Sequence, residues 1–227
     1  MVDVAFLTRV RIFANLNGKQ LQSLPDKLQP RRYQRGEVIF HEDDPADRMH
    51  IIVDGRVKIS IASEDGRERD IALFQSGDCF GEMALLDGSN RSATATAVYA
   101  TETMVFFRQG FLDFLGENPE LAADVNTMLV QRFRNVNQML GDMVFLDVPT
   151  RVAKQLLALA ETYAEDAKPG DQIVVPLSQG ELARLVGASR ETVSRALNSY
   201  RRLGTLGTSH RRNTITNLAR PEEMASF

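Results

Sequence analysis

A short segment around residue 82 combines side chains that bind an anion with one that binds a hydroxyl group. Gly81, Glu82 and Met83 are followed, after a glycine-containing turn, by Arg91 and Ser92. Glycine lets a ligand approach the backbone closely. The residues from Glu82 onward can start a short helix, whose first backbone N–H groups are free to bind an anion. Arg91 can hold a phosphate through two parallel hydrogen bonds, and Ser92 can add a hydroxyl. The segment indicates a ligand that carries both a hydroxyl and a phosphate, although on these residues alone an internal Glu82–Arg91 ion pair is at least as good an explanation.

A second group of side chains has the chemistry to read DNA. Arg190, Glu191, Ser194 and Arg195 are left on the outer face of a helix that Ser189 opens. Arginine can bond guanine O6 and N7 together and glutamate can accept from cytosine N4, and each good pair discriminates between bases by ~1–3 kcal/mol. Ser189 can bond a phosphate, helped by the exposed N–H groups of the helix start. This set predicts a recognition helix.

Two helices joined by a tight turn must position these residues. Ser178 and Glu181 form a capping box that opens the first helix, and Gly187 ends it, because the turn needs a positive φ. We place Ser178 with the DNA-contacting residues. Val193 and Leu197 face inward on the second helix, so the pattern is that of a helix-turn-helix. The alternative is a plain helical hairpin whose arginines are solvated.

The residues after the second helix predict a β-wing. Leu206 and Ile215 lie in short β-prone stretches on either side of a basic tip that contains Arg211 and Arg212. Such a tip can touch the phosphate backbone of DNA. A solvated hairpin is nearly as good an explanation.

The first half of the chain predicts β-structure over residues 33–108. Val57, Ile59 and Ile61 alternate with polar residues, which is the period of a half-buried strand. Glycines preceded by turn-forming residues recur every 11 residues from Gly55 to Gly88. Short strands with turns at this spacing are typical of an antiparallel sandwich or barrel, and we expect a jelly-roll β-domain.

A long helix should follow, because Asn118 and Pro119 form a cap and first-turn pair and the next proline is Pro149. Apolar positions between them step by four and three, over roughly 26 residues or about 39 Å. The seam consists of Val125, Leu129, Arg132, Val136, Met139 and Met143. An arginine on a single stripe favours pairing with the same helix of a second chain. The alternative is that the stripe packs on the β-domain.

Composition bounds the remaining possibilities. The chain has 227 residues and a formal net charge of −3, but residues 150–227 hold 11 Lys and Arg against 8 Asp and Glu. The negative net charge of the whole chain argues against a protein that coats nucleic acid indiscriminately. The excess of basic residues in the C-terminal part permits one basic face there. No apolar run approaches the ~20 residues of a membrane span. Cys79 is the single cysteine and is expected to be a small buried hydrophobe, the histidines are widely separated, and no nucleophile–base pair stands out, so we expect neither a metal site nor an enzyme.

The segment Gly187–Arg195 resembles the recognition segment of the Crp/Fnr regulators, the catabolite-activator family. The likeness covers nearly the whole chain and includes Gly81–Ser92, which is similar to the phosphate-binding cassette of cyclic-nucleotide-binding domains. The resemblance implies that Glu82 binds the ribose 2′-hydroxyl, that Arg91 and Ser92 bind the cyclic phosphate, and that backbone at Gly81 and Met83 contributes. It also implies that Arg190, Glu191 and Arg195 read a TGTGA-like half-site.

The resemblance further implies cAMP or a related nucleotide as effector, a homodimer on a palindromic site, and RNA polymerase as a partner. The long helix departs from the family pattern, because Val136 and Asn137 stand where cAMP-responsive members carry a threonine beside a small polar residue. Valine cannot make the hydroxyl bond to the base, and Asn137 can replace it.

The sequence thus predicts an α+β chain in three parts: a cyclic-nucleotide-binding β-domain over residues 1–117, a dimerisation helix and hinge over 118–147, and a winged helix-turn-helix over 148–227. The expected function is that of a cytoplasmic, ligand-gated transcription regulator with no required cofactor. One alternative binds DNA without a nucleotide. Another is a nucleotide-sensing module whose helical tail contacts protein.

Overall fold

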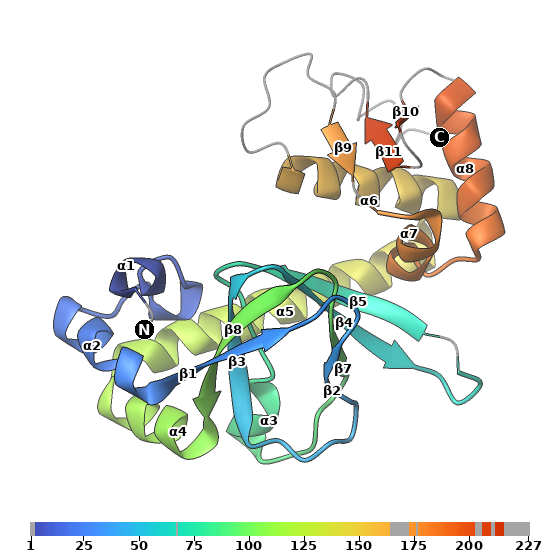
Figure 1. Cartoon of the computed structure of the whole chain (residues 1–227). Helices are drawn as coiled ribbons and strands as arrows, with labels where there is room; N and C mark the ends of the chain where they lie inside the picture. The colour runs from blue at the N-terminus through green and yellow to red at the C-terminus, as the bar shows by residue number, and fades with distance from the viewer. Residues whose placement is uncertain are drawn as a thin grey trace. The chain divides into compact units, whose positions relative to one another are not determined.

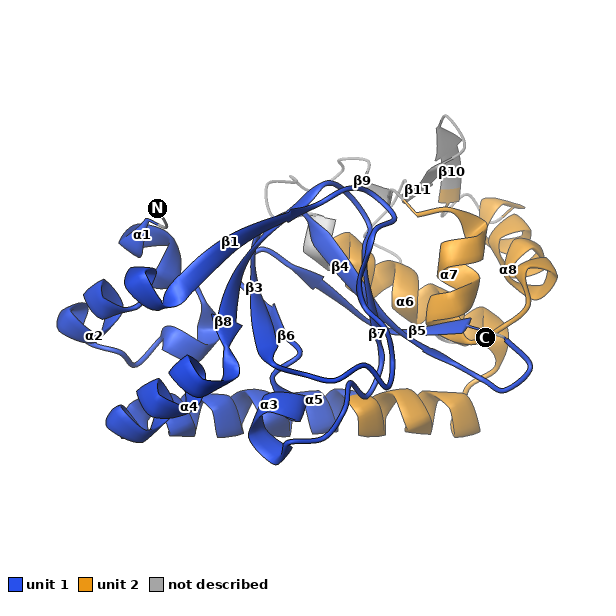
Figure 2. Cartoon of the chain, turned by 60° about the horizontal axis from the view of Figure 1, so that its bottom comes forward, with its two compact units in different colours: residues 1–135 blue, residues 136–227 orange. Residues whose placement is uncertain are grey.

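The computed structural model describes residues 3–66, 68–163, 173–175, 177–202, 206–209 and 212–215, and it describes side chains at residues 3–66, 68–160, 177–202 and 206. The chain divides into two compact units, residues 1–135 and 136–227 (Figure 2). The division falls within one continuous helix, α5 (Pro119–Phe145). Each unit is described by itself.

The first unit is built on two four-stranded antiparallel sheets, with strand orders β1-β8-β3-β6 and β2-β7-β4-β5 (Figure 1). The strands are β1 (Leu28–Tyr33), β2 (Val38–Phe40), β3 (Arg48–Asp54), β4 (Arg56–Ala62), β5 (Glu68–Gln75), β6 (Cys79–Phe80), β7 (Thr94–Ala97) and β8 (Thr101–Phe107). The glycines spaced by 11 residues all have positive φ at the turns. The predicted jelly-roll type of β-domain is confirmed. The β-structure begins at Leu28, and the predicted start was residue 33. The first strand can include Pro30, which has no backbone N–H, because β1 lies at the edge of its sheet.

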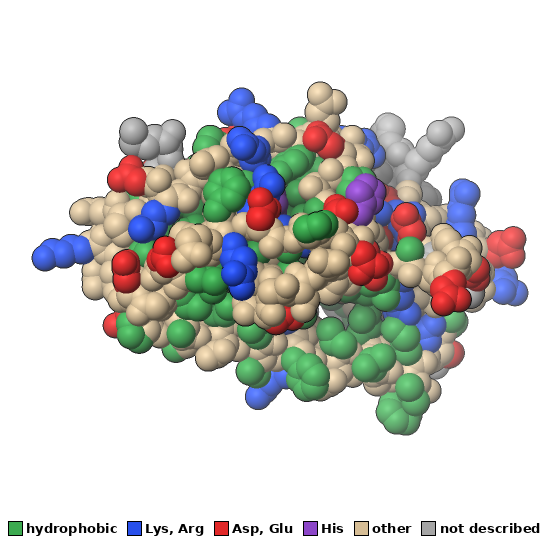
Figure 3. Space-filling model, turned by 90° about the horizontal axis from the view of Figure 1, so that it is seen from below, with side chains coloured by type: hydrophobic (Ala, Val, Ile, Leu, Met, Phe, Trp, Pro, Cys, Tyr) green, Lys and Arg blue, Asp and Glu red, His purple; other side chains and the backbone are tan. Residues whose placement is uncertain are grey.

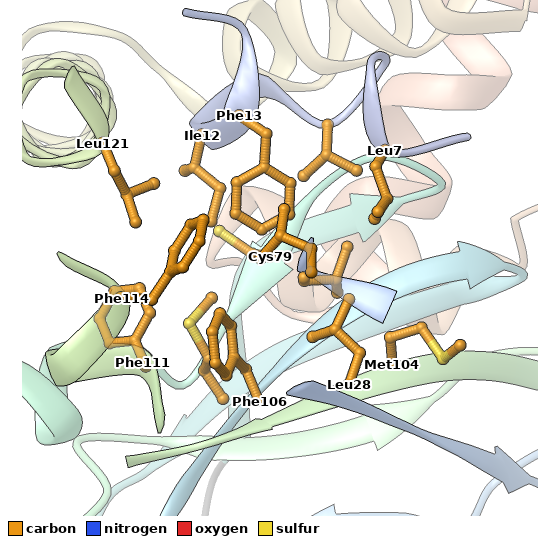
Figure 4. Close-up of a cluster of buried hydrophobic side chains, with 14 of the residues drawn as sticks. Leu7, Ile12, Phe13, Leu28, Cys79, Met104, Phe106, Phe111, Phe114 and Leu121 are labelled. Atoms are coloured by element: carbon orange, nitrogen blue, oxygen red, sulfur yellow. The ribbon is translucent and has the colours of Figure 1, made fainter. Parts of the chain in front are cut away.

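Short helices surround this sandwich and complete its main core. They are α1 (Val4–Leu7), η1 (Arg11–Phe13), α2 (Gly18–Ser23), η2 (Pro25–Lys27), α3 (Met83–Asp87) and α4 (Arg108–Glu117). Phe106 of β8 packs edge-on against Phe111 of α4, with ring centroids 5.5 Å apart, and Phe114 lies beside them (Figure 4). Cys79 is buried in the same cluster, as predicted. A smaller cluster fills the space between the sheets, around Ile52, Val57 and Phe80.

Helix α5 begins at Pro119 and carries a seam that divides into two parts. Val125 is buried in the main core and Leu129 packs against that core. Arg132 donates to groups of the β-domain, as described below, so the prediction that these positions face a second chain is wrong for Val125 and Arg132. Val136 is exposed. The predicted helical period is correct, but the first apolar residues of the stripe, Val125 and Leu129, pack on the core of the first unit.

The second unit holds the predicted helix-turn-helix and a three-stranded sheet of order β10-β11-β9. Its elements after α5 are α6 (Val148–Tyr163), β9 (Ile173–Val175), α7 (Gln179–Val186), α8 (Arg190–Arg202), β10 (Leu206–Ser209) and β11 (Arg212–Ile215). Leu156, Leu182 and Leu197 bury one face of each helix in a common core. The hydroxyl of Tyr200 donates to the carbonyl of Pro149 at 2.8 Å, which ties α8 to the start of α6.

Candidate nucleotide site and nucleic-acid interface

The cassette begins at a turn that only glycine tolerates. Gly81 follows β6 with φ of +81°, and a Cβ added there would lie 2.5 Å from Nη1 of Arg91. The chain then enters α3 (Figure 1), where the carbonyl of Glu82 accepts from the N–H groups of Leu85 and Leu86. The turn therefore brings Glu82 beneath the sandwich surface and the Gly81 carbonyl against Arg91.

Glu82 forms an ion pair with Arg132 of α5. Its side chain is only 1% exposed, and Oε1 accepts from Nη1 of Arg132. Nη2 of Arg132 donates to the carbonyl of Cys79, and the guanidinium lies over the ring of Phe74 at 4.8 Å from its centroid. The Glu82–Arg91 ion pair that the sequence left open is therefore not the pair that forms. Arg132 fixes α5 to the cassette at the carboxylate proposed to bind the ligand.

Arg91 is bonded to main-chain carbonyls. Nη1 donates to Gly81 at 2.8 Å, Nη2 donates to Arg48 at 2.6 Å, and the guanidinium stacks over Phe40 at 4.1 Å. The residue is 4% exposed, and this burial lowers the pKa of its guanidinium. An arginine side chain carries five N–H donors, so these two bonds leave three for another acceptor.

Two polar atoms in this cassette are buried without a hydrogen-bond partner. They are Oε2 of Glu82 and Nε of Arg91. A buried polar atom without a partner costs about 1–3 kcal/mol, so a ligand that supplies a partner recovers that free energy. One atom is an acceptor and the other is a donor, which suits a ligand hydroxyl and a ligand anion respectively.

The other predicted ligand residues lie on three segments: the start of α3, the loop residue after Arg91, and α5. Ser92 is exposed beside Arg91, and Met83 is half-exposed at the start of α3. Val136 and Asn137 lie about one turn beyond Arg132 on α5, and both are exposed. They belong to the part of α5 that falls in the second unit.

An aromatic cluster supports the Arg91 side of the cassette. His50 stacks on Phe80 with ring centroids 4.9 Å apart, and Phe40 lies 6.1 Å from the His50 ring. Burial, followed by the charges of Arg91 and Arg48, lowers the pKa of His50 to about 3. The ring is therefore neutral near pH 7 and packs as an aromatic residue.

A cavity of about 450 Å³ lies elsewhere in the first unit, between α1 and the β1-β8-β3 sheet. Phe6, Pro30 and Met104 line it together with Arg31 and Glu102. None of the predicted cassette residues borders this cavity. The nucleotide assignment therefore depends on the two buried atoms without a hydrogen-bond partner, Glu82 Oε2 and Arg91 Nε.

The recognition helix presents the predicted face. Val193 and Leu197 are buried in the core of the second unit, whereas Arg190, Glu191 and Arg195 are exposed on the opposite side of α8. Ser194 is half-buried beside them. The arrangement exposes two guanidinium groups and one carboxylate on this face, and Nη2 of Arg195 donates to the hydroxyl of Thr192 at 3.3 Å.

Two serines open the helices of this motif. Ser178 caps α7: its Oγ accepts from the N–H of Glu181, and its own N–H donates to the Glu181 carboxylate. Ser189 accepts from the N–H of Thr192. Gly187 has φ of +65° between the helices, which confirms the predicted turn. Arg211 lies outside the described residues, and Arg212 is described only as the first backbone position of β11.

Three residues outside the cassette contact its charged side chains or their partner and are not among the predicted ligand residues: Arg132 pairs with Glu82, Phe40 stacks against Arg91, and Phe74 stacks against Arg132. The sequence does carry a signal for Arg132, because a charged residue interrupts an apolar seam, but by itself that signal favours pairing between chains. Phe40 and Phe74 lie on β2 and β5, and no local pattern distinguishes them from other core aromatic residues.

Two further searches concern the described residues only. Within them, no group of three or more His, Cys, Asp and Glu is placed to hold a metal ion. None of the helices in this part of the chain combines the length and the hydropathy of a membrane span.

A β-sandwich with a polar cassette, followed by a long helix and a winged helix-turn-helix, defines the class of DNA-binding regulators that carry a nucleotide-sensing domain. Family models agree: the cyclic nucleotide-binding domain matches residues 30–118, and the Crp-like helix-turn-helix domain matches residues 150–223. The chain belongs to the Crp/Fnr family of transcription regulators.

Individual relatives are similar over most of their length. A CRP-like cAMP-activated global transcriptional regulator of Mycobacterium tuberculosis is 36% identical over 198 residues, which cover 87% of this chain and 88% of the relative. The cyclic AMP receptor protein of Thermus thermophilus is 32% identical and covers 86% and 87%. The solved structure of the c-di-GMP responsive global regulator CLP of Xanthomonas campestris has a TM-score of 0.79 at 23% identity and covers 88% of this chain and all of that one, which supports the fold.

Proposed function

We propose that this protein is a ligand-gated, sequence-specific transcription regulator whose effector is cAMP or a related cyclic nucleotide. The observation that carries the nucleotide part is the pair of orphaned atoms in the cassette, Glu82 Oε2 and Arg91 Nε. The observation that carries the assignment of DNA binding is the exposure of Arg190, Glu191 and Arg195 on one face of α8. Two relatives support the same effector class, since one is named a cAMP-activated regulator and the other a cyclic AMP receptor protein.

The cassette matches the chemistry of a cyclic nucleotide in two places. The ribose 2′-hydroxyl donates to Glu82 Oε2, and the cyclic phosphate accepts from Arg91 Nε and from the hydroxyl of Ser92. Backbone at Gly81 and Met83 also contributes to the phosphate site in this proposal, and the missing Cβ of Gly81 makes room for the guanidinium of Arg91. Each contact uses a donor or an acceptor that is otherwise unused in the cassette.

The dimer of this proposal forms along α5. A row of apolar side chains is exposed on this helix and consists of Val130, Phe133, Val136, Leu140, Val144 and Phe145. Figure 3 shows hydrophobic side chains gathered along one edge of the face it draws. From Val130 to Val144 these positions step by three and four residues, which is the period of a helix–helix contact. A two-fold pair of chains would present two recognition helices to a palindromic, TGTGA-like site, with half-sites about 34 Å apart.

Gating requires that the ligand bind one arrangement of α5 better than another. Arg132 couples the ligand carboxylate Glu82 to this helix. At its other end, Asp142 pairs with Lys154 of α6 at 2.6 Å. Arg151 of α6 donates to the carbonyls of Leu146 and Val186, at 2.8 and 3.1 Å. A displacement of α5 at Arg132 would therefore act on the turn that precedes the recognition helix.

Calorimetric titration with cAMP tests the nucleotide assignment. Arg91→Lys keeps the charge but loses the planar fork, so we expect at least a tenfold loss of affinity. Arg108→Lys is the matched control, because Arg108 bonds the Leu85 carbonyl near the cassette but is not assigned to the ligand. Absence of heat with the wild type would favour the regulator that needs no nucleotide. Equal losses in both variants would contradict the role of Arg91.

Selection from random duplexes, followed by fluorescence anisotropy, tests the DNA assignment. Arg190→Ala should relax base preference at one position, by ~1–3 kcal/mol. Arg202→Ala removes the same charge at the far end of α8 and should weaken binding evenly across sequences. Failure to enrich any palindrome would favour the alternative in which the helical tail contacts protein.

The remaining parts of the proposal follow from these. We divide the chain into a β-domain (1–117), a dimerisation helix with hinge (118–147) and a DNA-binding domain (148–227). DNA contacts come from Ser178, Ser189, Arg190, Glu191, Ser194 and Arg195 and from the wing residues Arg211 and Arg212. Because its partner is DNA, we place the protein in the cytoplasm and propose RNA polymerase as a further partner.

A further inference from the structure

We infer that Thr192 is a positioning residue: its hydroxyl holds the Arg195 guanidinium in place for base recognition and does not itself contact DNA. The inference rests on the proposed function, because it assumes that α8 reads DNA through Arg195. All of its residues belong to one segment of the second unit, residues 189–195. Thr192 is not among the residues assigned to DNA above.

Three side chains at the start of α8 form a chain of hydrogen bonds. Nη2 of Arg195 donates to Oγ1 of Thr192 at 3.3 Å, and Oγ1 of Thr192 lies 2.9 Å from Oγ of Ser189. Oγ of Ser189 also accepts from the backbone N–H of Thr192 at 3.2 Å. Thr192 is half-buried, whereas Ser189 and Arg195 are exposed. The Thr192 hydroxyl therefore joins an exposed guanidinium to the residue that opens the helix.

Helical spacing explains why these side chains meet. Residues three positions apart lie on one face of a helix, and their side chains lean toward its N-terminus. Arg195 therefore reaches back over Thr192, toward the end of α8 that a recognition helix presents to base edges. Arg190 differs in this respect, because within the described residues no hydrogen bond or ion pair holds its side chain. Of the two exposed arginines assigned to bases, Arg195 is the one that the protein itself orders.

The hydroxyl protons are consistent with one direction along this chain. A hydroxyl supplies one donor and two acceptors, and a guanidinium only donates. Thr192 Oγ1 thus accepts from Arg195 and can give its own proton to Ser189, whose proton stays available for a DNA phosphate. The guanidinium has five N–H donors, so the bond to Thr192 leaves others for guanine O6 and N7. Because Thr192 orders this side chain before DNA binds, less conformational entropy is lost on binding.

Base preferences of the full chain test the inference. Duplexes are selected with saturating cAMP, and single-base variants of the selected site are then compared by fluorescence anisotropy. The position read by each arginine is the one at which Arg195→Ala or Arg190→Ala relaxes the preference. Thr192→Val keeps the shape and β-branching of the side chain but removes the hydroxyl. We expect it to lower discrimination about fivefold at the position read by Arg195, since one hydrogen bond has an effect of that order. The position read by Arg190 should stay within about twofold of the wild type.

Three further variants separate positioning from other roles of Thr192. Thr192→Ser keeps the hydroxyl and should retain the wild-type preference at both positions. Ser199→Ala is the matched control, because it removes a hydroxyl that accepts from Arg202 at 3.3 Å near the far end of α8, and it should change no base preference. In the Arg195→Ala background, Thr192→Val should have no further effect on discrimination, because it acts through Arg195.

The possible outcomes distinguish the inference from the proposed function. Equal weakening on all sequences by Thr192→Val would show a direct phosphate contact and would overturn the inference. Unchanged discrimination in Thr192→Val, or no relaxed position in Arg195→Ala, would also overturn it. Each of these results leaves the proposed function intact, provided that a palindrome is enriched. Failure to enrich a palindrome would overturn the proposed function together with the inference.

Discussion

The ion pair between Glu82 and Arg132 should contribute far more to stability than a surface ion pair. Its carboxylate is 1% exposed and the Arg132 side chain is 25% exposed, so water screens the pair poorly. Removing one partner of a buried pair costs about 3–5 kcal/mol, whereas exposed pairs contribute about 0.2–1 kcal/mol. Because Arg132 keeps some solvent contact, we expect Arg132→Met to cost about 3 kcal/mol. Methionine retains an apolar stem against Phe74, so most of this cost comes from the lost charge.

A double-mutant cycle isolates the interaction. We expect Glu82→Gln to cost about 2 kcal/mol and the double variant about 3 kcal/mol, which gives a coupling energy of about 2 kcal/mol. Urea unfolding followed by far-UV circular dichroism measures these values; the chain contains no tryptophan. Arg134→Met, an exposed arginine half a turn away on α5, should change stability by less than about 0.5 kcal/mol. A coupling energy below about 0.5 kcal/mol would show that the pair is solvated and would refute this reasoning.

Three further predictions concern separate parts of the molecule. Burial lowers the pKa of His50 in the folded chain to about 3. Below pH ~6.5 the unfolded chain therefore binds a proton at this residue and the folded chain does not. The free energy of unfolding should fall by up to about 1.4 kcal/mol per pH unit between pH 6.5 and 3. His50→Phe should flatten that slope in acid titrations followed by circular dichroism, and an unchanged slope would exclude His50 as its source. Gly187→Ala forces a positive φ on a residue with a Cβ and should lower the free energy of unfolding by about 1–2 kcal/mol in urea titrations, whereas no loss would mean that the turn adapts. Phe133→Asp puts a charge on a side chain that is 66% exposed on α5 and should shift sedimentation velocity toward the monomer, so a persistent dimer would place the interface elsewhere.

Local patterns were sufficient to predict most of the fold. Alternation of apolar residues, the glycines at turns, and the capping box at Ser178 each depend on neighbours within a few positions along the chain. The strands, the long helix and the helix-turn-helix therefore appear close to where the sequence places them. The exposed face of α8 could be predicted for the same reason, since helical periodicity alone assigns Val193 inward and Arg190 outward.

The partners of the charged residues depended on tertiary structure. Glu82 and Arg132 are 50 positions apart, and nothing near either residue in the sequence selects the other. Likewise, the two carbonyls that bind Arg91 belong to Gly81 and Arg48, on segments brought together only when the sandwich closes.

The sequence by itself thus determined which residue types were available to bind an anion, a hydroxyl and DNA, because these are properties of individual side chains and of local spacing. Only the tertiary structure decided that Arg132 serves the cassette and that Glu82 and Arg91 each keep one buried polar atom without a partner. The physical reason is that burial and ion pairing depend on distances between segments remote in sequence, and periodicity within one segment carries no information about those distances.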